Sequence, residues 1–369
     1  MEGDRTVGYA VVGLGWISQA AMLPAFANAR HARLAALVSG GTDKRRRLAE
    51  RYHLDPERDT YAYDAFEACL ARDDVDAVYI AVPNHLHGEY TERAAAAGVH
   101  VLCEKPMAVT GEECRAMIRA CDEAGVELMV AYRLHFDPAN LGAVERVRSG
   151  AIGRTRVFSA TFTQQVEAGD IRLMPPERGG GPLYDIGIYC INAARYLFRA
   201  EPEAVWATRA SRPQARFDQA GEMMSCVLRF PGDRLATFTC SFGAHAVSVF
   251  HLVGDAGALR MDNAFNFTGE RRLEVVGDDG GTRTFSETDQ FGPQLDYFAG
   301  CVREDRRPEP DGEEGLVDVR IIRALYEALE DGSAVEIDVR RDRRPEPGMA
   351  AEYPSLEAPE LVGADEPSD

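Results

Sequence analysis

Short apolar runs alternate with helix-like segments over the first part of this 369-residue chain. The runs are rich in β-branched residues, and they span residues 7–12, 33–38, 75–82, 99–103 and 126–130. Helix-like stretches separate them, such as residues 90–97 and 112–124, and Gly125 follows the second as a typical helix C-terminus. Because strands that alternate with helices form a parallel sheet covered on both faces, the sequence predicts a doubly wound α/β domain.

The pattern changes near Gly153, where β-rich runs follow one another with turn signals between them. These runs span residues 155–162, 204–210, 223–230, 235–242 and 247–253. One helix is expected among them, at residues 183–197, and two more after them, at 293–303 and 316–329. This order predicts an α+β domain with a large open, mostly antiparallel sheet. We place the two domains at residues 5–135 and 136–340, and we expect residues 341–369 to be an acidic, Pro-rich, loosely held tail.

Composition narrows the possible partners and the compartment. A net charge of −19 argues against nucleic acid and against an anionic membrane surface. The eight cysteines have no C-x-x-C spacing, which indicates reduced, buried thiols and predicts no metal site. No apolar stretch is long enough to cross a bilayer, and no export signal precedes the first strand, so we expect a cytoplasmic protein.

A glycine-rich turn follows the first predicted strand. The segment Gly13-Leu14-Gly15-Trp16-Ile17-Ser18 matches the dinucleotide-binding pattern G-x-G-x-x-G, except that Ser18 replaces the last glycine. The first two glycines allow a tight turn and a close approach of the backbone to a pyrophosphate, and the following helix offers free N–H groups. The alternative is a glycine-rich turn without a ligand. Because the segment follows a strand at the start of an alternating α/β pattern, we favour a dinucleotide site of the Rossmann type.

The end of the second strand indicates which dinucleotide binds. An NAD site usually has a carboxylate there for the ribose 2′-hydroxyl. Here Ser39, Gly40 and Thr42 follow the strand, and the cations Lys44 and Arg45 come just afterwards. Hydroxyl donors and cations suit a 2′-phosphate, so we predict NADP and regard NAD as less fitting. The neighbouring arginines 46 and 47 fit an ordinary solvated helix face.

Lysine is almost absent from this chain. Of its 41 basic residues only Lys44 and Lys105 are lysines. Lys105 lies in Cys103-Glu104-Lys105-Pro106 at the end of a predicted parallel strand, the edge where open α/β sheets bind ligands. Arg cannot release a proton in a protein, whereas a desolvated Lys can, so Lys105 is a candidate catalytic group. The alternative is that two lysines persist by chance.

With these motifs the chain resembles the glucose–fructose oxidoreductase family, which includes inositol dehydrogenases, over residues 5–340. The matching segments are Gly13-Leu14-Gly15, Ala81-Val82-Pro83-Asn84-His85-Leu86-His87, Cys103-Glu104-Lys105-Pro106, and residues 179–189 with Asp185 and Tyr189. The resemblance is greatest to the branch of sugar dehydrogenases. In that family the lysine and an Asp-x-x-x-His pair are catalytic, and Tyr189 stands where the commoner histidine would be.

The resemblance implies a set of site residues. We expect Lys105, Tyr189 and Asp185 to be catalytic, with Tyr189 accepting the proton, Lys105 stabilising its negative charge and Asp185 orienting the groups. A second assignment makes Lys105 itself the acid and base, and Tyr189 and Asp185 could instead serve only packing and capping. The expected cofactor contacts are Gly13, Leu14, Gly15, Trp16, Ile17, Ser39, Gly40, Lys44, Arg45, Pro83, Asn84, His87, Glu104, Lys105, Arg133, Arg172 and Tyr297, and His135 could also hold polar groups of the substrate.

The expected activity is NADP-dependent oxidation of an aldose sugar, at its C1 hydroxyl. Three alternatives stay open: a sugar–sugar oxidoreductase with tightly bound NADP, a glycoside hydrolase that uses the dinucleotide transiently, and a non-catalytic NADP-binding regulator. An exposed face of the second sheet predicts a homodimer or homotetramer.

Overall fold

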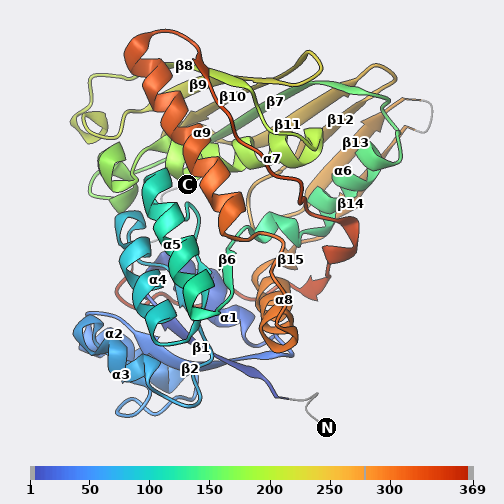
Figure 1. Ribbon diagram of the computed structural model, residues 1–369. Helices are drawn as coiled ribbons and strands as arrows, with labels where there is room; N and C mark the ends of the chain where they lie inside the picture. The colour runs from blue at the N-terminus through green and yellow to red at the C-terminus, as the bar shows by residue number, and fades with distance from the viewer. Residues whose placement is uncertain (1–4, 278–279, 365–369) are drawn as a thin grey trace.

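The computed structural model describes residues 5–277 and 280–364, in which two large sheets lie in two domains (Figure 1). The first sheet has the order β3-β2-β1-β4-β5-β6, and each neighbouring pair is parallel. Its strands are β1 Val7–Val12, β2 Ala32–Val38, β3 Thr60–Tyr61, β4 Ala77–Ile80, β5 His100–Cys103 and β6 Leu128–Val130. The predicted doubly wound parallel sheet is therefore confirmed.

Both faces of this sheet are buried. Alternate residues of β1 enter two separate hydrophobic cores, Ala10 and Val12 one of them and Tyr9 and Val11 the other. Such burial on both faces explains why the strands are continuously apolar and do not alternate with polar residues. The covering helices are α1 Leu23–Ala25, α2 Thr42–Arg51, α3 Phe66–Leu70, α4 His87–Ala96 and α5 Gly111–Ala124.

The second sheet has nine strands among the described residues, in the order β14-β13-β12-β11-β7-β10-β9-β8-β16. All pairs are antiparallel except β7 with β10, which agrees with the expected mostly antiparallel sheet. The strands are β7 Thr155–Gln165, β8 Ala204–Ala210, β9 Met223–Phe230, β10 Arg234–Ser241, β11 Gly243–Gly254, β12 Ala258–Asp262, β13 Arg271–Val276, β14 Gly281–Phe285 and β16 Val335–Glu336.

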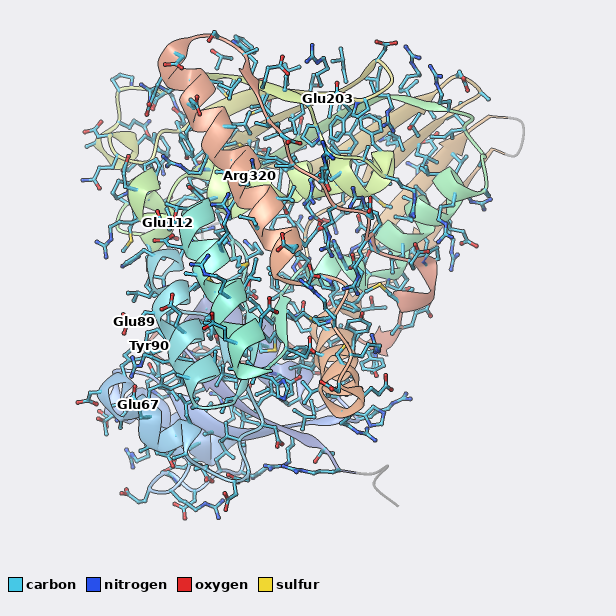
Figure 2. All side chains as sticks on the ribbon, in the orientation of Figure 1. Glu67, Glu89, Tyr90, Glu112, Glu203 and Arg320 are labelled. Carbon is cyan, nitrogen blue, oxygen red and sulfur yellow. The ribbon has the colours of Figure 1, made fainter. Side chains whose placement is uncertain are left out.

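Helices cover one face of the second sheet (Figure 1). They are α6 Pro138–Arg148, α7 Ile188–Phe198 and α9 Gly312–Asp331, while α8 Phe291–Glu304 packs against β1 and β2 of the first domain. The other face carries partly exposed apolar side chains, and charged groups such as Glu67, Glu89 and Glu112 lie on the outer surface of the first domain (Figure 2).

A cluster of buried charges connects α7, α9 and the chain that follows them. Arg195 of α7 contacts Glu201 at 2.5 Å, Glu314 at 3.0 Å and Asp318 at 2.6 Å. Arg341 reaches the same Glu314 at 2.5 Å. Buried charges are tolerated when they are paired in this way, so the cluster fixes the two helices and the following segment relative to one another.

The prediction of a loosely held tail is wrong for its described part, residues 341–364. Arg341 and Arg344 have side chains only 4% exposed within the charge cluster. The strand β17 Tyr353–Pro354 pairs with β15 Thr288–Asp289, and Val362 is buried in the core of the first domain. Ion pairs and strand pairing hold the tail in place. A polar composition does not show which partners these groups have in the fold.

Candidate functional site

The glycine-rich segment after β1, Gly13 to Ser18, forms the dinucleotide loop. Gly13 has φ +94°, and a Cβ there would lie 2.4 Å from the carbonyl oxygen of Ala81, so only glycine fits. A Cβ on Gly15 would meet no atom within 4 Å, which leaves its backbone open to a ligand. Ser18, at the position of the usual third glycine, donates from its hydroxyl to the Gly13 carbonyl at 2.6 Å. The loop thus has the open backbone that a pyrophosphate requires.

Two cations lie at the carboxyl end of β2. The ammonium of Lys44 donates to the Leu14 carbonyl of the dinucleotide loop at 3.3 Å. The guanidinium of Arg45 donates to the Ser39 carbonyl and, at 3.3 Å, to the hydroxyl of Thr42. The buried Nε of Arg45 has no hydrogen-bond partner. These residues fit a 2′-phosphate, since cations and a hydroxyl occupy the place where an NAD site has a carboxylate.

The three predicted catalytic residues come together from two domains. Lys105 follows β5, next to a cis peptide bond to Pro106, and its ammonium donates to the backbone carbonyl of Asp185 at 3.0 Å. The same nitrogen lies 3.4 Å from the Asp185 carboxylate and 4.8 Å from the ring centroid of Tyr189. The Lys105 side chain is 13% exposed. An ammonium, a carboxylate and a phenol therefore share one partly open cluster.

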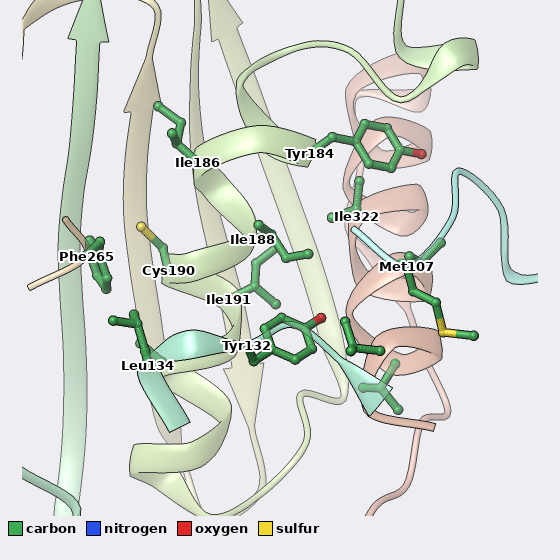
Figure 3. Close-up of a cluster of buried hydrophobic side chains, with 14 of the residues drawn as sticks. Met107, Tyr132, Leu134, Tyr184, Ile186, Ile188, Cys190, Ile191, Phe265 and Ile322 are labelled. Atoms are coloured by element: carbon green, nitrogen blue, oxygen red, sulfur yellow. The ribbon is translucent and has the colours of Figure 1, made fainter. Parts of the chain in front are cut away.

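Asp185 and Tyr189 lie at the start of the central helix of the second domain. A π-helical turn, Leu183–Gly187, carries Asp185, and α7 begins immediately afterwards. Figure 3 shows buried apolar side chains of the same segment, with Ile188 and Ile191 on the side that faces Ile322 of α9. The packing of this segment on both sides holds the two polar side chains toward Lys105, and π-helical turns are frequent at functional sites.

The glycines before this helix allow the two domains to approach. Gly179 has φ +77°, and a Cβ there would lie 2.7 Å from Cβ of Asn84. The Asn84 amide donates to the Gly179 carbonyl at 2.7 Å. The predicted residue Asn84, which follows Pro83 at the end of β4, thus has a contact across the domain boundary.

Arg133 lies beside Tyr189 and also binds Phe265 and Gln290. Its guanidinium carbon lies 4.9 Å from the Tyr189 ring centroid, and the group donates to the Phe265 carbonyl at 2.5 Å and to the side chain of Gln290. Gln164 donates to the Asp185 carboxylate at 3.2 Å. Sequence reasoning missed Gln164, Phe265 and Gln290, because they belong to the β-rich domain and to no recognisable motif.

Electrostatics keep the ammonium charged. Burial lowers the pKa of Lys105, but negative charge on Tyr189 and Asp185 outweighs it and raises the pKa above its ordinary value. The neighbouring Glu104 accepts from the Tyr79 hydroxyl at 2.6 Å, and burial raises the pKa of Glu104. Lys105 is therefore a cation in the neutral range.

Four predicted contacts lie in other environments. His87 is fully buried, with its ring nitrogens 2.9 Å from the carbonyls of Pro106 and Val82, and burial lowers the pKa of His87 to about 4. Both nitrogens face backbone oxygens, so His87 braces the turns and is not free for a cofactor. The hydroxyl of Tyr297 accepts from the backbone of Glu309 at 3.0 Å, and its ring packs on Phe136, so that prediction is corrected too.

The remaining two residues belong to the second domain or to the domain boundary. Arg172 pairs with Asp170 at 2.6 Å and lies 3.7 Å from the Asp185 carboxylate, so it is placed to act on the substrate side and not at the dinucleotide loop. His135 is buried between Glu309 and Asn192, at 2.8 Å from each, and does not face the Lys105 cluster.

The described residues, 5–277 and 280–364, have neither a candidate metal site nor a membrane-spanning helix. They contain no group of three or more His, Cys, Asp or Glu side chains arranged to hold a metal ion. No helix in this part of the chain combines the length and the apolar character needed to cross a membrane.

Comparison with known proteins agrees with this geometry. Residues 7–132 match the family model described as "Oxidoreductase family, NAD-binding Rossmann fold", and residues 141–283 match the "GFO/IDH/MocA C-terminal domain". A D-xylose 1-dehydrogenase [NADP(+)] of Haloarcula marismortui is 36% identical over 345 residues, which cover 91% of this chain and 94% of that protein.

Solved structures have a similar fold. The aldose–aldose oxidoreductase of Caulobacter crescentus, complexed with glycerol, has a TM-score of 0.86 and 37% identity over 90% of this chain and all of that one. A 3-ketoreductase of Actinomadura kijaniata, in complex with NADP and TDP-benzene, has a TM-score of 0.79 and 28% identity over 88% and 98% of the two chains. The chain therefore belongs to the Gfo/Idh/MocA family of oxidoreductases.

Proposed function

We propose that this chain is an NADP-dependent oxidoreductase that oxidises an aldose at its C1 hydroxyl to the lactone. The observation that carries the proposal is the cluster of Lys105, Asp185 and Tyr189 at the carboxyl edge of the parallel sheet. The cations Lys44 and Arg45 beside the dinucleotide loop support NADP. The NADP-linked xylose dehydrogenase and the aldose–aldose oxidoreductase among its relatives support an aldose.

Oxidation of a hydroxyl group removes a hydride and a proton, and a bound nicotinamide supplies the hydride acceptor. Tyr189 takes the proton as the phenolate, whose negative charge the neighbouring cations Lys105 and Arg133 stabilise. Lys105 stabilises the negative charge on the phenol and polarises the substrate oxygen. Asp185, held by Gln164 and Arg172, orients the substrate and the ammonium.

In the other assignment, Lys105 itself accepts the proton. The raised pKa of Lys105 disfavours this role, since its amine would have to be neutral before it could take a proton from the sugar. We therefore retain Tyr189 as the base.

The Tyr189→Phe variant tests the assignment of Tyr189 as the base. We expect it to lower kcat by about 10²–10⁴-fold, the usual contribution of a general base. Steady-state kinetics across pH is the measurement, with Tyr184→Phe as the matched control. Tyr184 is a buried tyrosine of the same segment, and its hydroxyl donates to the Val109 carbonyl, outside the Lys105 cluster. Turnover of Tyr189→Phe close to that of the parent would contradict the assignment.

The cofactor assignment is tested by Lys44→Ala. We expect KM for NADP+ to rise about ten- to a hundredfold, since a hydrogen bond to a charged group contributes about 1.5–3 kcal/mol. KM for NAD+ should change little, because NAD+ has no 2′-phosphate. Arg47→Ala, an exposed position on the same helix, is the matched control. An equal effect on both cofactors would count against contact between Lys44 and the 2′-phosphate.

The substrate is tested with a panel of aldoses and polyols, assayed with NADP+ and NAD+ through the absorbance of the reduced cofactor. We expect aldoses such as xylose and glucose to be oxidised with NADP+ and polyols to react poorly. A wide preference for NAD+ would overturn the cofactor assignment. Release of a leaving group from glycosides without net reduction would indicate the hydrolase instead.

We also propose a homodimer or homotetramer built on the open face of the second sheet. Leu235, Val157, Val253 and Val276 are 41–57% exposed and form one row with Ala258 across five strands. An apolar row of this kind on a sheet surface favours association with another copy.

Light scattering tests the interface with Leu235→Glu. We expect this variant to have a smaller assembly mass than the parent, because a carboxylate at the β10 end of the row would be desolvated on association. Ala96→Glu adds the same charge at an exposed position of α4 and should leave the mass unchanged. A parent protein that is monomeric at all concentrations would contradict the proposal.

A further inference from the structure

The end of the described chain returns to the first domain. At the end of β17, the amide of Asn28 donates to the carbonyl of Pro354 at 2.9 Å, and Arg51 of α2 donates to the carbonyl of Glu360 at 2.6 Å. After Pro354, residues 355–363 cross the side of the domain that bears the dinucleotide loop. We call these residues the strap.

The strap is attached directly behind the dinucleotide loop. The Gln19 side-chain amide donates to the Val362 carbonyl at 3.1 Å and accepts from the Val362 N–H at 2.8 Å. The same Gln19 amide donates to the Leu14 carbonyl of the loop at 2.9 Å, and Gln19 is fully buried. One buried side chain therefore joins the strap to the loop through three hydrogen bonds.

Apolar burial reinforces this attachment. The Val362 side chain is 3% exposed and belongs to the same hydrophobic core as Leu14 of the loop and Leu48 of α2. Removing a buried valine from water is favourable, so the strap end is an anchored part of the domain. The middle of the strap, including Leu356 and Pro359, also forms one wall of a cavity of about 290 Å³ whose other walls include Trp16 of the loop.

The strap also passes beside Lys44. A Cβ on Gly363 would lie 3.3 Å from Cε of Lys44, so the backbone of the strap runs along the side chain assigned to the 2′-phosphate. Lys44 itself donates to the Leu14 carbonyl. The loop, Lys44 and the strap are thus in mutual contact on the adenosine side of the predicted cofactor site.

We infer that the strap is part of the cofactor site and retains NADP(H) between turnovers. By bracing the loop through Gln19 and confining Lys44, it restricts the movements that would release the adenosine phosphate. The inference rests on the proposed place of the 2′-phosphate at Lys44, and it does not depend on which sugar is oxidised. Slow cofactor exchange would favour a sugar–sugar oxidoreductase with retained NADP over a dehydrogenase that exchanges its cofactor in every cycle.

NADPH release tests the inference directly. The protein is loaded with NADPH and mixed in a stopped-flow instrument with excess NADP+, and the decay of NADPH fluorescence gives the dissociation rate without any sugar. Two variants loosen the strap: a chain truncated after Pro354, which keeps the charge cluster and β17, and the full-length Val362→Ser. We expect dissociation about tenfold faster in both, the factor that corresponds to about 1.4 kcal/mol.

Glu352→Gln is the matched control, because Glu352 is an exposed tail residue that precedes the strap and lies outside its anchored end. Its dissociation rate should equal that of the parent. Thermal unfolding of each variant shows whether it is folded, and Val362→Ser decides the question if the truncated chain is not. Parental dissociation rates in the folded strap variants would overturn the inference.

The outcome can be separated from that of the proposed function. If the strap variants release NADPH faster and the parent oxidises no sugar, the proposed activity is wrong but the role of the strap in retaining NADP(H) stands. If the parent oxidises sugar and every strap variant releases NADPH at the parental rate, the role of the strap is wrong but the proposed activity stands.

Discussion

The common direction of six strands is the constraint on which the site depends. Because β1, β2, β4, β5 and β6 all run the same way, the segments that follow them meet at one edge of the sheet. The dinucleotide loop, the cations after β2, the Asn84 turn and Lys105 are therefore neighbours, although almost a hundred residues separate the first from the last. An antiparallel strand within this set would send its following segment to the opposite edge.

The second domain completes the site by holding one helix against that edge. Asp185 and Tyr189 stay near Lys105 because α7 is fixed on two sides, by apolar packing around Ile188 and by the buried charges around Arg195. Removing one partner from such a cluster would leave an unpaired buried charge, which is costly. The cluster that secures the catalytic helix also includes Arg341, so the same ion pairs direct the tail toward the first domain.

Much of the fold could be predicted from residue patterns, and part of the site could not. The limits of β1, β8 and β9 follow from their apolar runs, and the α5 terminus follows from Gly125. Position in the sequence favours His87 and Tyr297 as cofactor contacts, but in the structure both bind the protein's own backbone. Gln164 and Gln290 escaped notice because nothing in their local sequence distinguishes them from other polar residues near strands.

By itself the sequence determined the order of strands and helices, the dinucleotide loop, and the hydroxyl groups and cations at the carboxyl end of β2, while the family resemblance pointed to Lys105, Asp185 and Tyr189. These are local properties, set by backbone sterics, periodicity and residue chemistry. Only the tertiary structure decided which groups surround Tyr189, that Arg172 faces Asp185, and that the polar tail returns to Gln19 and Lys44. Such contacts join residues far apart in the chain, and their free energy comes from burial and pairing that exist only once both partners are in place.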